Sequence, residues 1–142
     1  MISASAPFAA SSELCSALSA IGTVQVTETG TLLFRQGEDV KGIYVLNSGR
    51  VRLSLTDAAT GSVSDRYAEP GSVLGLPATM SGNAYSLTAE VHSPSEVVFV
   101  PRDRVLEMLR LQPALCFEVV EILAQEVAHM RRHAATAFSS VN

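Results

Sequence analysis

The fold is decided by the stretch Ile43-Tyr44-Val45-Leu46-Asn47-Ser48-Gly49-Arg50-Val51-Arg52-Leu53-Ser54-Leu55-Thr56. Its second half, residues 50–56, alternates polar and apolar side chains, which is typical of a β-strand with one solvated face. Its first half, residues 43–47, is rich in apolar, β-branched and aromatic residues, and Ser48-Gly49 between the halves is a turn signal. The stretch therefore predicts two antiparallel strands that meet at Ser48-Gly49.

Similar short β-rich segments lie on both sides of this stretch. Turn signals separate them at residues 36–38, 60–61 and 70–71. All nine glycines of the chain fall between Gly22 and Gly82, which marks the turn-rich part. We expect a sandwich or jelly roll over residues 23–101. The further predicted strands are 23–28, 31–35, 63–68, 84–92 and 97–100.

Helical patterns flank the predicted roll at both ends. Ser11 and Ser12 are cap residues for a short helix over residues 12–20. After Pro101 the apolar period becomes that of a helix, first over residues 102–110 and then, opened by Pro113, to about residue 135. The C-terminal helices thus span 102–135, followed by a tail over 136–142. The predicted fold class is mainly β with flanking helices, in one domain.

The long helix carries two apolar stripes. One repeats at spacings of four and three residues over nearly three heptads, as in a coiled-coil seam. The other runs through Leu115, Val119 and Ile122 and stops at Glu126. We therefore expect the start of the helix to pack on its own sheet and the seam to pair with a second copy, although burial within one subunit is the alternative. The seam residues are Cys116, Val120, Leu123, Val127, Met130 and Ala134.

Composition narrows the classes of function. The chain has 142 residues, a formal charge of −4 and a single lysine, Lys41. Binding to a nucleic-acid backbone needs several basic side chains on one surface, so we expect no direct DNA binding by this chain alone. The sequence has no run of about 20 apolar residues and no basic, apolar leader, so we expect a cytoplasmic protein without a membrane segment.

The spacing of the glycines resembles that of a known family. Gly37, Gly49, Gly61, Gly71 and Gly75 stand 12, 12, 10 and 4 residues apart, within the motifs 33–38, 43–51 and 70–75. This resembles the cyclic-nucleotide-binding domain of the Crp/Fnr-type bacterial transcription regulators, over residues 14–132. The resemblance implies an antiparallel β-roll with a short N-terminal helix and a long C-terminal dimerisation helix.

In that family the ligand lies in a cassette whose Gly-Glu pair binds the ribose and whose arginine binds the cyclic phosphate. By resemblance, Gly75 keeps the glycine here, Leu76 replaces the glutamate and Tyr85 stands in place of the arginine. Ser86 and Thr88 keep the small polar residues beside it. Without the charged partners of the phosphate and ribose, ordinary tight cAMP binding is not expected.

Two alternatives follow for the cassette. Tyr85 and the backbone amides of Ser81, Gly82 and Asn83 could bind another small effector, including a weakly held cyclic nucleotide. Otherwise Leu76 and Tyr85 simply fill the old pocket as core residues. In family members the long helix also reaches the base of the nucleotide, and counting from Pro113 places Met130 and Arg131 at those positions.

No chemistry of catalysis is visible. His129 and His133 are four residues apart on the long helix, but no third metal ligand stands near them, so a haem or metal sensor is less favoured. Cys15 and Cys116 are far apart in sequence and are expected to be buried free thiols. We therefore expect a non-enzymatic effector domain of a Crp/Fnr-like transcription regulator, without the helix-turn-helix. A ligand-free dimerisation module is the alternative.

Overall fold

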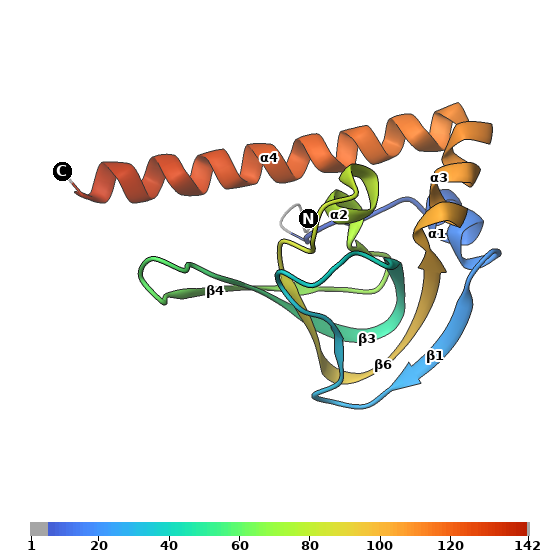
Figure 1. Cartoon of the computed structure of the whole chain (residues 1–142), viewed down its shortest axis with the longest axis horizontal. Coiled ribbons are helices and arrows are strands. Elements are labelled where there is room, and N and C mark those ends of the chain that lie inside the picture. Colours follow the sequence, from blue (N-terminus) through green and yellow to red (C-terminus); the bar gives the residue numbers. More distant parts are fainter. Residues whose placement is uncertain (1–5, 142) are drawn as a thin grey trace.

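A computed structural model describes residues 6–141, with side chains as far as Arg132. It shows a curved antiparallel β-roll with helices packed along one side (Figure 1). The long helix α4 (Pro113–Val141) crosses the open side of the roll, in red and orange at the top of Figure 1. The predicted fold class, mainly β with flanking helices, is confirmed.

The roll is built around two long strands that pair along nearly their whole length. β3 (Gly42–Thr56) pairs antiparallel with β6 (Thr88–Pro101), and the six-stranded sheet has the path β1-β6-β3-β4. β2 pairs with β6 and β5 pairs with β3, off this path. The shorter strands are β1 (Thr23–Thr27), β2 (Leu32–Phe34), β4 (Val63–Ala68) and β5 (Val73–Leu74).

The prediction of a turn at Ser48-Gly49 is wrong, because β3 continues through these residues as a single strand. The pairing with β6 shifts register between Leu46 and Val51, so the segment is an irregular bulge that bends the strand. Gly49 has φ 93°, which is the backbone freedom that signalled a turn. The Ser95 hydroxyl oxygen fills the bulge and accepts a 3.1 Å hydrogen bond from the Arg50 backbone N–H.

Two further predicted strands also form a single strand in the structure. The segments 84–92 and 97–100 form the single strand β6, which starts only at Thr88 and continues through residues 93–96. Residues 84–87 lie outside it. The other predicted strands agree with the observed ones to within a residue at each end.

The flanking helices agree with the sequence except at their ends. α1 (Ser12–Ser19) is capped by Ser11, whose hydroxyl oxygen accepts from the Leu14 N–H at 3.1 Å. α3 (Arg102–Leu111) leads into α4. The tail predicted for residues 136–142 is wrong over its described part, because α4 continues to Val141.

A short helix, α2 (Leu76–Ser81), was not predicted. It is bounded by Gly75 and Gly82, which have φ 93° and 82°, and Pro77 lies in its first turn. Its six residues are too few for a periodic apolar signal, and its buried residues Leu76, Ala78 and Thr79 are held by tertiary packing. α2 lies between the roll and α4 (Figure 1).

The first half of α4 covers the roll through one of its two apolar stripes. Val119 and Ile122 are buried in the main core together with Val105 and Leu109 of α3, and Leu115 is half-buried against it. This confirms that the start of the helix packs on its own domain. No helix in the part of the chain described is long and apolar enough to span a membrane.

Candidate functional site

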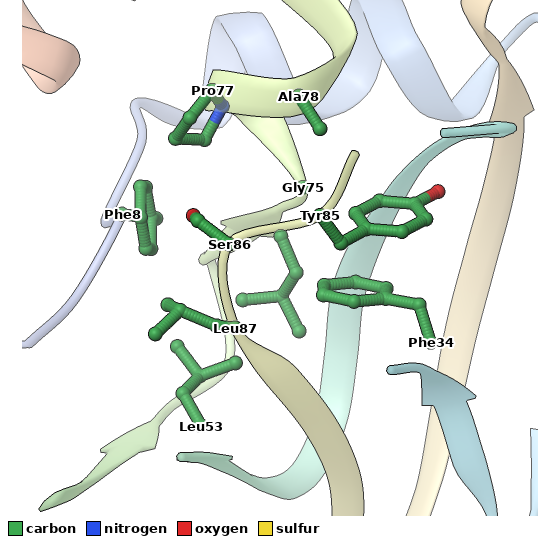
Figure 2. Close-up of a pocket in the computed structure, with 10 residues that line it drawn as sticks. Phe8, Phe34, Leu53, Gly75, Pro77, Ala78, Tyr85, Ser86 and Leu87 are labelled. Carbon is green, nitrogen blue, oxygen red and sulfur yellow. The ribbon is translucent and has the colours of Figure 1, made fainter. Parts of the chain in front are cut away.

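The cassette region forms where β5 turns into α2 and where the chain returns into β6. Gly75 is the N-cap residue of α2, and residues 85–87 lead directly into β6. Figure 2 shows these segments facing each other around a small cavity, with Pro77 and Ala78 of α2 above it. The fold thus brings together Gly75, Tyr85 and Ser86, as the family resemblance implied.

Tyr85 is a core residue whose hydroxyl makes hydrogen bonds within the fold. Its side chain is only 4% exposed, and its ring stacks on Phe34 with a centroid separation of 4.0 Å and an interplanar angle of 12°. Its hydroxyl donates to the Gly42 carbonyl oxygen at 2.8 Å and accepts from the Lys41 and Gly42 N–H groups at 3.1 Å. The hydroxyl therefore clamps the start of β3 rather than pointing into an open site.

Gly75 lies directly against Gly42 and the Tyr85 ring. A Cβ at this position would stand 3.0 Å from the Gly42 carbonyl oxygen and 3.2 Å from the Tyr85 ring, at φ 93°. Only glycine fits that approach without moving the backbone. The adjacent Leu76 is fully buried and packs in the core.

The space that remains in the cassette is about 10 Å³, enough for about one water molecule. None of the described residues that line it carries a formal charge. In this conformation the cassette is closed. Its lining residues are Phe8, Phe34, Leu53, Leu74, Gly75, Pro77, Ala78, Tyr85, Ser86 and Leu87.

The amides expected to bind an anion are already used. The Gly82 N–H closes α2 by donating to the Ala78 carbonyl at 2.7 Å, and the Asn83 N–H donates to the Ser81 hydroxyl at 3.2 Å. The Thr88 hydroxyl accepts from the Gln36 N–H at 2.9 Å. The expectation of an open anion nest at residues 81–83 is therefore wrong for this conformation.

Met130 and Arg131 are not brought to the cassette. Both are exposed on α4, and neither lines the cassette cavity. Met130 is 62% exposed. Their assignment as ligand contacts therefore stays a prediction, one that needs a different conformation or a second copy of the chain.

Two aromatic residues near the cassette were missed by the sequence reasoning. Phe34 stacks on Tyr85, and its ring also lies 6.2 Å from that of Tyr44. Burial raises the pKa of Tyr44, with smaller contributions from Tyr85 and Glu38. Phe8 lines the cavity opposite Tyr85 (Figure 2). The sequence signal for Phe8 was only a lone aromatic ahead of the first helix.

A second, larger cavity of about 610 Å³ lies between the N-terminal segment, β4 and α4. Its walls carry Arg66, Glu118, Glu126 and His129, and Phe8 lines it as well as the cassette. The Glu126 carboxylate is 12% exposed and forms a 2.5 Å ion pair with the Arg66 guanidinium. Two of the charged side chains on its wall, Arg66 and Glu126, thus bind one another.

No metal centre is formed by the residues described, among which no three His, Cys, Asp or Glu side chains cluster. His133, the predicted neighbour of His129, has its side chain outside the described residues. His92 lies edge-on to the Tyr67 ring at 4.9 Å. Cys15 and Cys116 are both free thiols, but each is only partly buried, so the predicted full burial is wrong.

The family model described as "Cyclic nucleotide-binding domain" matches residues 24–112, which is more than half of the chain. The chain therefore belongs to the cyclic nucleotide-binding domain family. The match covers the roll, α2 and α3, and it includes the cassette.

Two curated relatives are transcription regulators by name. The transcriptional activator protein FnrA of Stutzerimonas stutzeri is 28% identical over 99 residues, covering 69% of this chain and 40% of the relative. The anaerobic regulatory protein of Bacillus subtilis (strain 168) is 26% identical over 123 residues, covering 86% of this chain and 50% of the relative. The chain spans half or less of the length of these relatives.

A solved structure shows the same fold at low sequence identity. Oxidized CprK in complex with o-chlorophenolacetic acid superposes with a TM-score of 0.74 at 18% identity, covering 94% of this chain and 56% of CprK. This likeness confirms the predicted roll with its flanking helices.

Proposed function

We propose that this chain is the ligand-sensing effector domain of a Crp/Fnr-like transcription regulator, acting in the cytoplasm by binding rather than by catalysis. The proposal is supported by the match to the family model and by the fold, which brings Gly75, Tyr85 and Ser86 together between α2 and β6. The switch would work by differential affinity for two conformations.

The effector is a small organic molecule that tolerates an apolar cassette. Tyr85 stands in place of the phosphate-binding arginine, and the lining residues described carry no charge, so a cyclic phosphate would lose its charge-assisted bonds. Because only about 10 Å³ is open, the effector must shift at least one lining side chain as it enters. The solved relative CprK, in complex with o-chlorophenolacetic acid, supports a small aromatic compound as one ligand class to test.

The signal would leave the domain through a homodimer formed by α4. The predicted seam residues Val120, Val127 and Met130 are each at least half exposed, and Leu123 is partly buried against the core. Ala134, the last seam residue, has its side chain outside the described residues. Such a stripe of apolar side chains on one helix favours pairing with a second helix.

DNA binding would come from a segment or partner beyond this domain. The chain has ten basic and fourteen acidic residues and a charge of −4, which disfavours contact with a phosphate backbone.

A thermal-shift panel tests ligand sensing. It would contain cyclic mono- and dinucleotides, haem, and small aromatic acids at up to millimolar concentration. We expect cAMP to leave the melting temperature unchanged and an apolar organic effector to raise it. The variant Ser86→Trp should abolish the rise, because Ser86 is exposed at the mouth of the cassette. Ala58→Trp, at an exposed position between β3 and β4 and outside the cavity lining, is the matched control.

A ligand-free dimerisation module is the second candidate. It is favoured by the closed cassette and by the use of the Tyr85 hydroxyl within the fold. This candidate predicts that no compound raises the melting temperature of a chain that still forms dimers, which is the outcome that would exclude ligand sensing.

A further inference from the structure

The N-terminal strap, defined here as residues 6–10, ties the cassette to α4 through Phe8. The Phe8 carbonyl oxygen accepts from the Val73 N–H of β5 at 2.9 Å, two residues before Gly75. The Phe8 N–H donates to the Glu126 carboxylate of α4 at 3.2 Å. One residue of the strap therefore bonds both to the cassette wall and to the long helix.

Phe8 holds an unfavourable backbone conformation while it does so. Its φ is 56°, the one positive φ of a non-glycine residue in the described part of the chain. A bulky residue adopts this conformation only where its surroundings hold it there. Its ring is 5% exposed and fills the side of the cassette opposite Tyr85 (Figure 2). Phe8 lines both the cassette and the larger cavity.

Two carboxylates of α4 accept hydrogen bonds from the N-terminal part of the chain. Glu126 binds the Phe8 N–H and pairs with Arg66 of β4. Glu118 accepts from the Ser11 backbone N–H at 2.8 Å and from its hydroxyl at 2.7 Å, just after the strap. These carboxylates are eight residues apart and so lie on nearly the same face of the helix. The docking of α4 on this side is thus linked to the position of the strap.

We propose that Phe8 is an internal plug that closes the cassette and that its backbone couples cassette opening to the release of α4. An effector that enters the cassette displaces the ring, and the strained backbone relaxes. The hydrogen bond to Glu126 is then lost, and α4 becomes free to change its packing. By thermodynamic linkage, release of α4 also opens the cassette. The inference rests on the proposed function for its trigger, but the coupling itself needs no ligand.

Native-state hydrogen exchange of the ligand-free chain, followed by NMR, tests the coupling. The two ends of the strap are perturbed separately, by Phe8→Gly at the cassette and by Glu126→Gln at the helix. Phe8→Gly removes the ring and relieves the positive φ. Glu126→Gln keeps an oxygen acceptor but loses the ion pair with Arg66. Glu121→Gln, an exposed carboxylate on the wall of the same larger cavity, is the matched control.

Each substitution should change amide hydrogen exchange at the other end of the coupled contact. Glu126→Gln should speed exchange of the Val73 amide about tenfold, because the Phe8 N–H then donates to a neutral oxygen and the ion pair with Arg66 is lost. Phe8→Gly should speed exchange of the α4 amides around residue 122 to a similar extent. The double variant should exchange no faster than the faster single variant, because the two changes open the same contact. The control should exchange as the unmodified chain does.

Purely local effects would overturn the coupling. Such a result would be faster exchange at the perturbed end with unchanged exchange at the other, or additive rates in the double variant. Where Phe8→Gly fails to fold, the milder Phe8→Leu provides the same comparison. A chain that binds no effector but shows coupled exchange would refute ligand sensing and leave the plug intact, so the two failures are distinguishable.

Discussion

At the scale of single residues, the closed state of the cassette depends on the hydrogen bonds that the Tyr85 hydroxyl makes. This position holds a phenol that bonds to the Lys41 and Gly42 backbone. The same residue also packs against Phe34 and limits the space at Gly75. Tyr85 is therefore part of the core.

Removing this hydroxyl should destabilise the domain. Tyr85→Phe leaves the buried Gly42 N–H without the phenol oxygen that accepts from it, so the free energy of unfolding should fall by about 1–3 kcal/mol. Tyr67→Phe is the control, since the contacts of Tyr67 with Arg50 and His92 are made by its ring, and it should change stability by less than about 0.5 kcal/mol. Urea unfolding measures both. Equal losses in the two variants would contradict the role given to Tyr85.

Cys15 provides a second prediction at this scale. Burial raises the pKa of its thiol, and the nearby negative charge of Glu118 raises the pKa further. Less thiolate is therefore present at pH 8 than in an ordinary cysteine, and alkylation by iodoacetamide should be slow. Because the folded pKa is raised, the thiol's contribution to stability is present at neutral pH and is lost as the pH rises through that value.

The Glu118→Gln variant separates these two causes. It removes the negative charge, so the pKa of Cys15 should fall and alkylation at pH 8 should become faster, although burial keeps the reaction slower than that of an unfolded chain. Mass spectrometry of the Cys15 peptide follows the rate. Glu121→Gln is the matched control, and an equal acceleration in that variant would contradict the local effect of Glu118.

At the scale of elements, the long strand β3 shows where local sequence signals mislead. Ser48-Gly49 has the composition of a turn, and Gly49 does take the positive φ that a turn needs. The pairing of β3 with β6 on both sides of this point keeps the strand continuous and turns the same glycine into a bulge. Local chemistry predicted the backbone conformation, whereas long-range pairing decided its use.

The bulge should tolerate no side chain. Gly49→Ala places a Cβ against the Ser95 side chain and the Pro94 carbonyl at φ 93°, while Gly37→Ala has φ 89° and open space around the new Cβ. Both variants bear the left-handed strain of about 1–2 kcal/mol. Gly49→Ala should lose about 1–3 kcal/mol more through the clash, as measured by urea unfolding. Similar stabilities would show that the bulge is not tightly packed.

The helix α4 was predicted better than β3 because its signal is periodic and long. Its two stripes separated correctly, with Val119 and Ile122 buried and Val120 and Val127 exposed. Its end was misjudged, since residues 136–141 are helical and contain no break that the predicted tail required. The short helix α2 left no such signal, and tertiary packing alone defines it.

At the scale of the whole molecule, the exposed face of α4 predicts self-association. Val127→Glu places a charge on the seam at a position that is 50% exposed in the single chain, so we expect a homodimer to shift toward monomer. Val24→Glu, at an equally exposed position on the edge strand β1, is the control and should leave the dimer unchanged. Sedimentation equilibrium measures both. An unmodified chain that stays monomeric at high concentration would contradict the dimer.

Periodicity, glycine spacing and residue type are local properties of the chain, and they were enough to predict the family and the β-roll with its flanking helices. The folded chain was needed to show that β3 and β6 are continuous, that the cassette is closed, and that Phe8 lines it while bonded to Glu126. These features depend on contacts between residues far apart in the chain, such as the 118 positions that separate Phe8 from Glu126. Pairing and packing at that range leave no local pattern from which they could be predicted.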